Sequence, residues 1–150
     1  MSGFDVIVVG FGYAGGIAAI AAHDAGARVL LLEKQPDPGG ISVCSAGGVR
    51  CNDRPDEAFA YLVATNAGTT PEHVLRALAE GMRELPAFVG GLAEAIGAKV
   101  SLRPAPGNYP FPGYDNFAFI NVDTTPDFDP RIAFPAVRGA EAGARLFQVV

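Results

Sequence analysis

The chain has 150 residues with two cysteines, two histidines and no tryptophan, which is the size of one ordinary domain or part of one. Two cysteines exclude a disulfide scaffold and a four-cysteine zinc module. The hydrophobic fraction of 49% and the charged fraction of 18% are typical of a globular chain. A net charge of -5 argues against a nucleic-acid partner.

The amino terminus and the two cysteines bear on the cellular compartment. The first residues lack the basic region of a secretory signal, and no segment is long and apolar enough to span a membrane. We therefore expect a cytoplasmic protein without a membrane span. Cys44 and Cys51 have no histidine near them at ligand spacing, so we expect both to be small buried side chains without a redox or metal role.

The opening segments predict a βαβ unit. Residues 4–9 form an apolar run rich in β-branched residues, which indicates a strand covered on both faces in a parallel sheet. Residues 13–25 are almost wholly Ala, Ile and Gly, a composition that suits a helix packed closely on a sheet, with Gly26 as its C-terminal cap. Residues 28–32 are the second strand. The crossover between the strands is expected to be right-handed.

The middle of the chain predicts helices. One helix covers residues 55–67, and another begins at residues 70–72 and carries an apolar stripe as far as Leu85. Pro86 is expected to end or kink that helix. A third, shorter helix is expected over residues 87–96.

The remainder of the chain is less regular. Residues 99–102 are a candidate strand. Residues 103–135 contain seven prolines and read as a long loop with one candidate strand at residues 117–122. A last helix is expected to begin near Gly139 and to be cut short at residue 150, which suggests that residues 1–150 are the N-terminal part of a larger domain.

The first candidate site is a glycine motif. Gly10, Gly12 and Gly15 form G-x-G-x-x-G between the first strand and the first helix, and Glu33 follows at the end of the second strand. In this setting Gly10 allows the tight turn, Gly12 lets the backbone approach a pyrophosphate, and Gly15 lets the helix lie close to the strands. The helix N-terminus then offers N–H groups to phosphates.

Glu33 bears on the choice of nucleotide. Its carboxylate can accept hydrogen bonds from both ribose hydroxyls and would repel a 2′-phosphate, so FAD or NAD is favoured over NADP. Lys34 beside it weakens that exclusion. The alternative is a structural glycine turn with a surface glutamate.

A second glycine segment, residues 39–48, distinguishes between FAD and NAD. It reads Gly-Gly-Ile-Ser-Val-Cys-Ser-Ala-Gly-Gly, where a classical NAD domain would begin its next helix. Paired glycines let the backbone lie against a flat ring and donate N–H groups to its polar edge, while Ser42 and Ser45 add hydroxyls. This suits a flavin, although a flexible glycine loop is the alternative.

These motifs together resemble the N-terminal FAD-binding part of the fumarate reductase and succinate dehydrogenase flavoprotein family, which includes the 3-ketosteroid dehydrogenases. The resemblance is carried by residues 5–15, by residues 32–34, and by Gly39-Gly40-Ile41-Ser42 with Ala46-Gly47-Gly48. It returns at residues 139–146, which resemble a glycine-rich helix of the family. It implies an α/β, Rossmann-like βαβ FAD-binding fold of the glutathione-reductase type, incomplete here and with a helical insertion.

The resemblance also implies which residues hold FAD. The ADP half would be held by Gly10, Gly12, Tyr13, Ala14, Gly15, Glu33 and Lys34. The flavin would be held by Gly40, Ile41, Ser42, Ala46, Gly47 and Gly48. In the family, the proton donor and most substrate contacts come from later segments, so no catalytic residue and no metal ligand is assigned within this chain.

Two departures from the family pattern refine this expectation. Ile41 stands where covalent members carry the flavin-linking histidine, so FAD is expected to be noncovalent. Residues 133–135 do not reproduce the His-Arg-Pro segment of members that reduce fumarate, which argues against fumarate as substrate.

Other chemically able residues read as structural. His23 and His73 are expected at the surface, and so are Arg131 and Arg138, although these two arginines could instead meet an anionic substrate. The aromatic residues of the long loop suggest a small hydrophobic cluster, or alternatively a wall near a substrate; they are Tyr109, Phe111, Tyr114, Phe117 and Phe119.

The sequence thus predicts the N-terminal portion of a FAD-dependent oxidoreductase. It would exchange hydride between flavin N5 and a carbon of a C–C single or double bond beside a carbonyl, in a small-molecule substrate, together with a missing C-terminal part of the same enzyme. One alternative is a non-catalytic nucleotide-binding module or an inert fragment that retains FAD weakly and tends to aggregate. Another is a NAD-dependent dehydrogenase.

Overall fold

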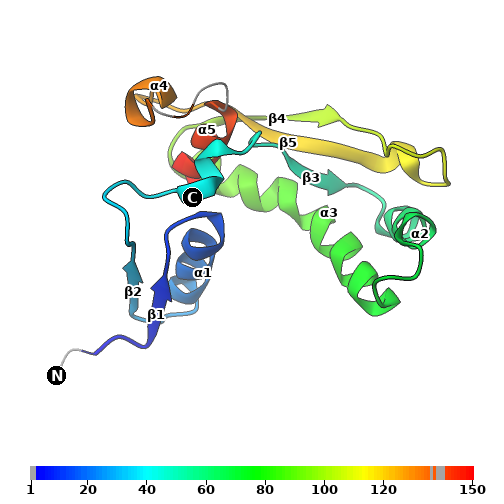
Figure 1. The fold of residues 1–150 in the computed structure, drawn as a ribbon, viewed down its shortest axis with the longest axis horizontal. Helices are drawn as coiled ribbons and strands as arrows, with labels where there is room; N and C mark the ends of the chain where they lie inside the picture. Colours follow the sequence, from blue (N-terminus) through cyan, green and yellow to red (C-terminus); the bar gives the residue numbers. More distant parts are fainter. Residues whose placement is uncertain (1–2, 136, 138–140) are drawn as a thin grey trace. The chain divides into compact units, whose positions relative to one another are not determined.

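A computed structural model describes residues 3–135, 137 and 141–150. The chain divides into two compact units, each described here by itself: Met1–Gly47 with Thr125–Val150, and Gly48–Thr124. Figure 1 traces the elements of both units along the chain.

The first unit opens with the predicted βαβ arrangement. Strand β1 (Val6–Val9) pairs in parallel with β2 (Val29–Leu32), and helix α1 (Tyr13–Asp24) connects them. The chain leaves α1 through Gly26, which has a φ of +87° and donates its N–H to the carbonyl of His23. The predicted α/β fold class is confirmed.

The two-stranded sheet is less covered than its sequence predicts. Side chains that alternate along β1 remain exposed, with Ile7 at 60% and Val9 at 82% of their full accessibility. The prediction of a strand covered on both faces is therefore wrong for this chain. The parallel pairing itself is confirmed, since β1 and β2 align from Val6 opposite Val29 onward.

The first unit closes with two C-terminal helices. Helix α4 (Pro130–Ala133) is capped by Asp129, whose carboxylate accepts the N–H of Arg131 at 2.9 Å. Helix α5 (Glu141–Val149) buries its small and apolar residues and contacts the short 3-10 helix η1 (Gly40–Cys44). The predicted start of this helix near Gly139, and part of the resemblance over residues 139–146, lie outside the described residues.

The second unit is a three-stranded antiparallel sheet with two helices. The strand order is β3 (Val49–Asn52), β5 (Phe117–Thr124) and β4 (Lys99–Pro104). Helix α3 (Glu72–Ala95) contacts all three strands, and α2 (Pro55–Asn66) packs on α3 (Figure 1).

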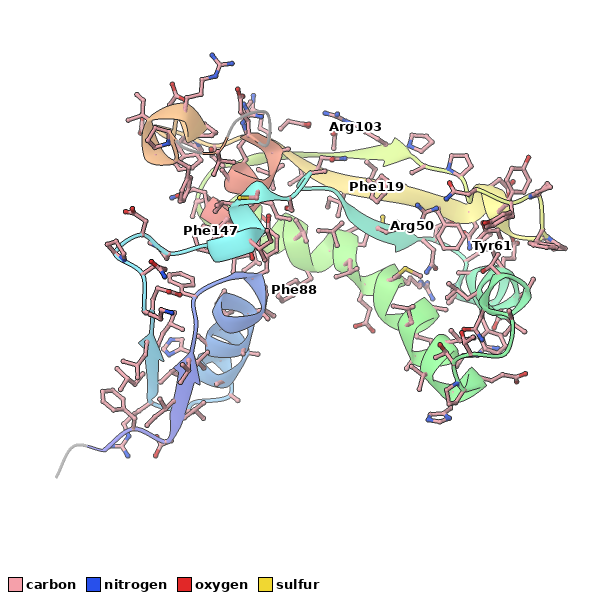
Figure 2. The ribbon with its side chains drawn as sticks, viewed as in Figure 1. Arg50, Tyr61, Phe88, Arg103, Phe119 and Phe147 are labelled. Atoms are coloured by element: carbon pink, nitrogen blue, oxygen red, sulfur yellow. The ribbon has the colours of Figure 1, made fainter. Side chains whose placement is uncertain are left out.

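The core of the second unit forms where α2, α3 and β5 meet. The buried cluster at this point consists of Ala58, Tyr61, Ala79, Met82 and Phe117, and Ile120 and Val122 of β5 are buried as well. The guanidinium of Arg50 lies over the rings of Phe117 and Phe119, 4.8 and 5.3 Å from their centroids. Arg50 and Phe119 are labelled in Figure 2. The predicted aromatic set is thereby split, since Phe117 is buried whereas Tyr109, Phe111 and Tyr114 are exposed.

Two buried asparagines join the helices of the second unit to the segments around them. The Asn52 side chain donates to the carbonyl of Ala79 in α3 at 2.8 Å. Asn116 accepts the backbone N–H of Arg54 and donates to its carbonyl, at 3.0 and 2.6 Å. These bonds give partners to the Asn52 amide nitrogen and to both polar atoms of Asn116, which burial would otherwise leave unpaired.

Helix α3 corrects one prediction about the middle of the chain. It runs unbroken through Pro86, so residues 87–96 are not a separate helix. A proline removes its own N–H from the helix ladder, and its ring crowds the carbonyl of the residue four positions earlier. The apolar stripe continues beyond it through Val89 and Ala93, both buried, and this burial favours one long helix over two.

The segment 103–135 is more regular than a long loop. The predicted strand is confirmed as β5, extends to Thr124, and pairs with a strand on each side. Strand β3 was not predicted, because Val49–Asn52 is short and mixes polar with apolar residues. Cys51 in β3 is buried as expected, but Cys44 in η1 is exposed, so that prediction is wrong.

No helix in the part of the chain that the structure describes is both long and apolar enough to cross a bilayer.

Replacing the most buried large side chain tests the core of the second unit. Ile120→Ala empties a position that is 2% exposed, so we expect the free energy of unfolding to fall by about 2–5 kcal/mol. Urea denaturation followed by circular dichroism measures it. Ile132→Ala is the matched control, since Ile132 is 79% exposed; an equal loss in both variants would contradict this assignment of the core.

Candidate functional site

The first glycine turn brings α1 close to the end of β1. Gly10 has a φ of +98° and donates its N–H to the carbonyl of Leu32 at 2.7 Å. A Cβ on Gly15 would overlap the carbonyl oxygen of Gly10. The motif therefore has the tight turn and the close approach of helix and strand that its spacing predicts.

The N-terminus of α1 meets the second glycine segment. Gly12 is the N-cap residue and has no side chain to cap the helix. Instead the Ser42 hydroxyl oxygen accepts the N–H of Tyr13 at 3.0 Å. A Cβ on Gly12 would lie 2.9 Å from that oxygen, so the missing side chain makes room for Ser42. In addition, the Gly39 N–H donates to the carbonyl of Phe11 at 2.6 Å.

The second segment forms a short helical turn rather than an extended loop. Gly39 and Gly40 have φ angles of +110° and +50°, which favour glycine, and they lead into η1. Val43 is buried in the core of the first unit, whereas Ile41 is 85% exposed. The turn thus has one buried anchor and one open side.

Residues 45–47 lie directly against α5. A Cβ on Gly47 would overlap the backbone of Ala142, and one on Gly143 would overlap the carbonyl oxygen of Ser45. Ala46, between the two contacts, is exposed. Gly48 belongs to the second unit, where it packs beside Phe119, so the structure does not group it with the other site residues.

The phenol of Tyr13 joins three of these elements. Its hydroxyl donates to the carbonyl of Gly143 at 2.7 Å and lies 3.1 Å from the Ser45 hydroxyl. Burial raises the pKa of this phenol, and the Ser45 hydrogen bond opposes that rise. Its ring lies 6.2 Å from that of Phe147 of α5, the residue labelled beside η1 in Figure 2.

Glu33 lies at the first glycine turn. Its carboxylate accepts the backbone N–H of Gln35 at 2.8 Å and that of Phe11 at 2.7 Å. These two hydrogen bonds, with Gln35 the larger cause, hold the pKa of Glu33 below its usual value of 4.5. A carboxylate has about four lone-pair sites, so acceptor capacity remains. Lys34 next to it is exposed.

The site residues named from sequence therefore fall into two groups. Most of the set lies within the first unit, around the N-terminus of α1 and the turn packed on it: Gly10, Gly12, Tyr13, Ala14, Gly15, Glu33, Lys34, Gly40, Ile41, Ser42, Ala46 and Gly47. Three participants were not named as site residues, namely Phe11, Ser45 and Gly143. Ser45 had a signal of its own in the sequence, as a hydroxyl inside the second glycine segment, whereas Phe11 and Gly143 were only part of the matched segments 5–15 and 139–146.

The other chemically able residues do not join this group. His23 and His73 are exposed, as predicted. Arg131 is exposed and paired with Glu141 at 2.7 Å, and Arg138 lies outside the described residues. Across the described ranges, no three His, Cys, Asp or Glu side chains gather as a metal site.

Known proteins share this chain's sequence and geometry. The model of a family described as FAD binding domain matches residues 5–108, which is more than half of the chain. The chain belongs to the FAD binding domain family. Membership in this family implies FAD as the cofactor.

Two curated relatives match the N-terminal part of this FAD binding domain chain. "Fumarate reductase (cytochrome)" of Shewanella frigidimarina is 56% identical over 45 residues, covering 30% of this chain and 8% of the relative. "3-oxosteroid 1-dehydrogenase" of Mycolicibacterium smegmatis is 34% identical over 97 residues, covering 57% of this chain and 17% of the relative. The chain thus spans less than a fifth of either protein.

A solved structure in the family's fold matches more of the chain. It is 3-ketosteroid delta1-dehydrogenase from Sterolibacterium denitrificans in complex with 1,4-androstadiene-3,17-dione, with a TM-score of 0.67 and 30% identity. The match covers 79% of this chain and 23% of that chain. The Rossmann-like FAD-binding fold expected from the sequence is confirmed.

Gly15 gives a direct test of the close approach of α1 to β1. Gly15→Ala places a methyl group on the Gly10 carbonyl, so we expect a loss of about 1–3 kcal/mol in the free energy of unfolding. Gly81→Ala makes the same chemical change in α3, where a Cβ meets open space, and should gain up to about 1 kcal/mol. Thermal unfolding of both variants measures these changes. Equal shifts of the melting temperature in the two variants would contradict the close approach of α1 to β1.

Glu33 gives a pH test. Because its pKa is lower in the folded chain than the ordinary 4.5, its contribution to stability is present above that value and is lost as the pH falls through the folded pKa. We therefore expect Glu33→Gln to be less stable than the wild type near neutral pH, with the difference shrinking as the pH falls below 4.5. Urea titrations of both proteins measure the difference, and a constant gap would contradict the prediction.

Proposed function

We propose that this chain is the FAD-binding N-terminal part of a FAD-dependent oxidoreductase that holds the cofactor noncovalently. The observation that supports this best is the contact between the two glycine segments, where the Tyr13 N–H donates to Ser42 at 3.0 Å. A dinucleotide needs its diphosphate site and its ring site side by side. Two segments that meet at the positive end of a helix suit that requirement.

The residues around the first turn would bind the ADP half. The N-cap residue Gly12 has no side chain, and Ser42 takes only the N–H of Tyr13, so the positive end of α1 still favours the negative charge of a diphosphate. Glu33 retains acceptor capacity for ribose hydroxyls. The residues proposed for this half are Gly10, Gly12, Tyr13, Ala14, Gly15, Glu33 and Lys34.

The second glycine segment would bind the flavin. Its exposed positions, Gly40, Ile41 and Ala46, are open to a planar ring. Ile41 has a hydrocarbon side chain that cannot form a covalent bond to the flavin, which supports noncovalent attachment. Within the first unit, the residues proposed for this half are Gly40, Ile41, Ser42, Ala46 and Gly47.

The proposed chemistry is transfer of hydride between flavin N5 and a carbon of a C–C bond beside a carbonyl. Bound FAD would supply the redox chemistry, and the residues above would bind and orient it. The names fumarate reductase and 3-oxosteroid 1-dehydrogenase both denote redox at such a bond. Fumarate itself is disfavoured as substrate because residues 133–135 differ from the His-Arg-Pro pattern. In this segment Phe134 packs on Phe147, with their ring centroids 6.4 Å apart.

A second candidate is a nucleotide-binding module without catalysis of its own. It is favoured by the exposed face of β1, since a two-stranded sheet buries little surface. In that case FAD would bind weakly and no substrate would be turned over.

Nucleotide selectivity tests the proposed function. Equilibrium dialysis of the chain against FAD, NADH and NADPH should give the tightest binding for FAD and the weakest for NADPH. Acid precipitation should release all of the flavin into the supernatant. Tighter binding of NADH than of FAD would favour a NAD-dependent dehydrogenase, and no binding of any nucleotide would refute the proposal.

A matched pair of charge-removing variants tests the role of Glu33. Glu33→Gln should weaken FAD binding about 10- to 100-fold, the value of a hydrogen bond to a charged group, and should reduce the discrimination against NADPH. Asp37→Asn removes the same charge four positions away on an exposed residue and should leave both affinities unchanged. Equal effects in the two variants would indicate net charge rather than a specific contact.

A further inference from the structure

Four groups around Tyr13 form a hydrogen-bonded chain with one direction. The Tyr13 hydroxyl donates its single proton to the carbonyl of Gly143. The Ser45 hydroxyl, 3.1 Å away, must then donate to the Tyr13 oxygen. The Ser45 oxygen in turn accepts the N–H of Gly47 at 3.2 Å. We name this chain, from the Gly47 N–H through Ser45 and Tyr13 to the Gly143 carbonyl, the Tyr13 latch.

The latch connects two functional segments through one residue. The backbone of Tyr13 is the first residue of α1, and its N–H meets Ser42 at the proposed diphosphate site. Its side chain reaches residues 45–47 of the proposed flavin segment. Tyr13 is the residue between Gly12 and Ala14 in the glycine motif, and the motif itself requires no aromatic side chain there.

The latch also sets which atoms face outward. Ser45 and Gly47 are anchored, the first by Tyr13 and the second by its packing on Ala142. Ala46 between them is exposed, so the middle of the turn is open to a ligand. Without the phenol hydroxyl, Ser45 loses its acceptor, and the turn at residues 45–47 keeps only its packing on Ala142 and Gly143 of α5.

We propose that Tyr13 is a positioning residue for the flavin ring, acting through Ser45 and Gly47, and that it contributes little to holding the ADP half. This inference rests on the proposed function and deepens it. It moves the role of the Tyr13 side chain from the diphosphate end of the cofactor to the ring end.

The test compares a whole cofactor with its ADP half. Tyr13→Phe keeps the ring that packs beside Phe147 and removes only the hydroxyl. We expect its dissociation constant for FAD to rise about three- to tenfold, the value of one or two neutral hydrogen bonds, while that for ADP stays unchanged. Ser45→Ala should give the same selective loss, and the double variant should lose little more than either single one.

A second hydroxyl deletion serves as the control. Tyr61→Phe removes a phenol that accepts the N–H of Tyr109 in the second unit and should change neither affinity. A selective effect on FAD in this variant as well would overturn the inference. So would an equal loss of FAD and ADP in Tyr13→Phe, because that pattern means a general structural role.

A measurement without ligand tests the latch itself. Amide hydrogen exchange of Gly47, followed by NMR, should be about three- to tenfold faster in Tyr13→Phe than in the wild type. If the exchange rate of the Gly47 amide is the same in both proteins, the proposed hydrogen-bonded chain is wrong. A wild-type chain that binds neither FAD nor ADP overturns the proposed function and this inference together, whereas wild-type binding without a selective loss in Tyr13→Phe overturns this inference alone.

Discussion

The close approach of α1 to the end of β1 is the constraint on which the first unit depends. Gly15 lies so near the Gly10 carbonyl that only a residue without a side chain fits there. This approach places the helix N-terminus immediately after the strand, and Ser42 then reaches the N–H of Tyr13. The positive end of the α1 dipole, the first glycine turn and the Ser42 hydroxyl therefore lie close together, because α1 packs directly against the end of β1.

The second glycine segment depends on a contact of the same type. Gly47 packs on the backbone of α5, and Gly143 of α5 packs on Ser45. At both positions the absence of a side chain leaves room for the neighbouring backbone. The turn at residues 45–47 is exposed at Ala46, and its other side packs on α5.

The local parts of this structure could be predicted from sequence. The βαβ start, α2 and β5 follow from hydrophobic patterns within short windows, and the glycine motif with Glu33 follows from spacing. Other parts depend on distant partners. Tyr13 and Gly143 are 130 positions apart, and no periodicity indicates that pairing. Residues Val49–Asn52 form strand β3 because β5 pairs with them. Helix α3 continues through Pro86 because Val89 and Ala93 are buried beyond it.

The contrast between the two cysteines has a practical consequence for studying this chain. Cys44 is exposed at the end of η1, while Cys51 is buried in β3 and its thiol lies 3.4 Å from the carbonyl of Ala118. Burial raises the pKa of the Cys51 thiol, so its reactive thiolate is scarcer still. A maleimide dye should therefore attach at a single position in the native protein, and a spectroscopic reporter can be placed within η1 without mutating any residue.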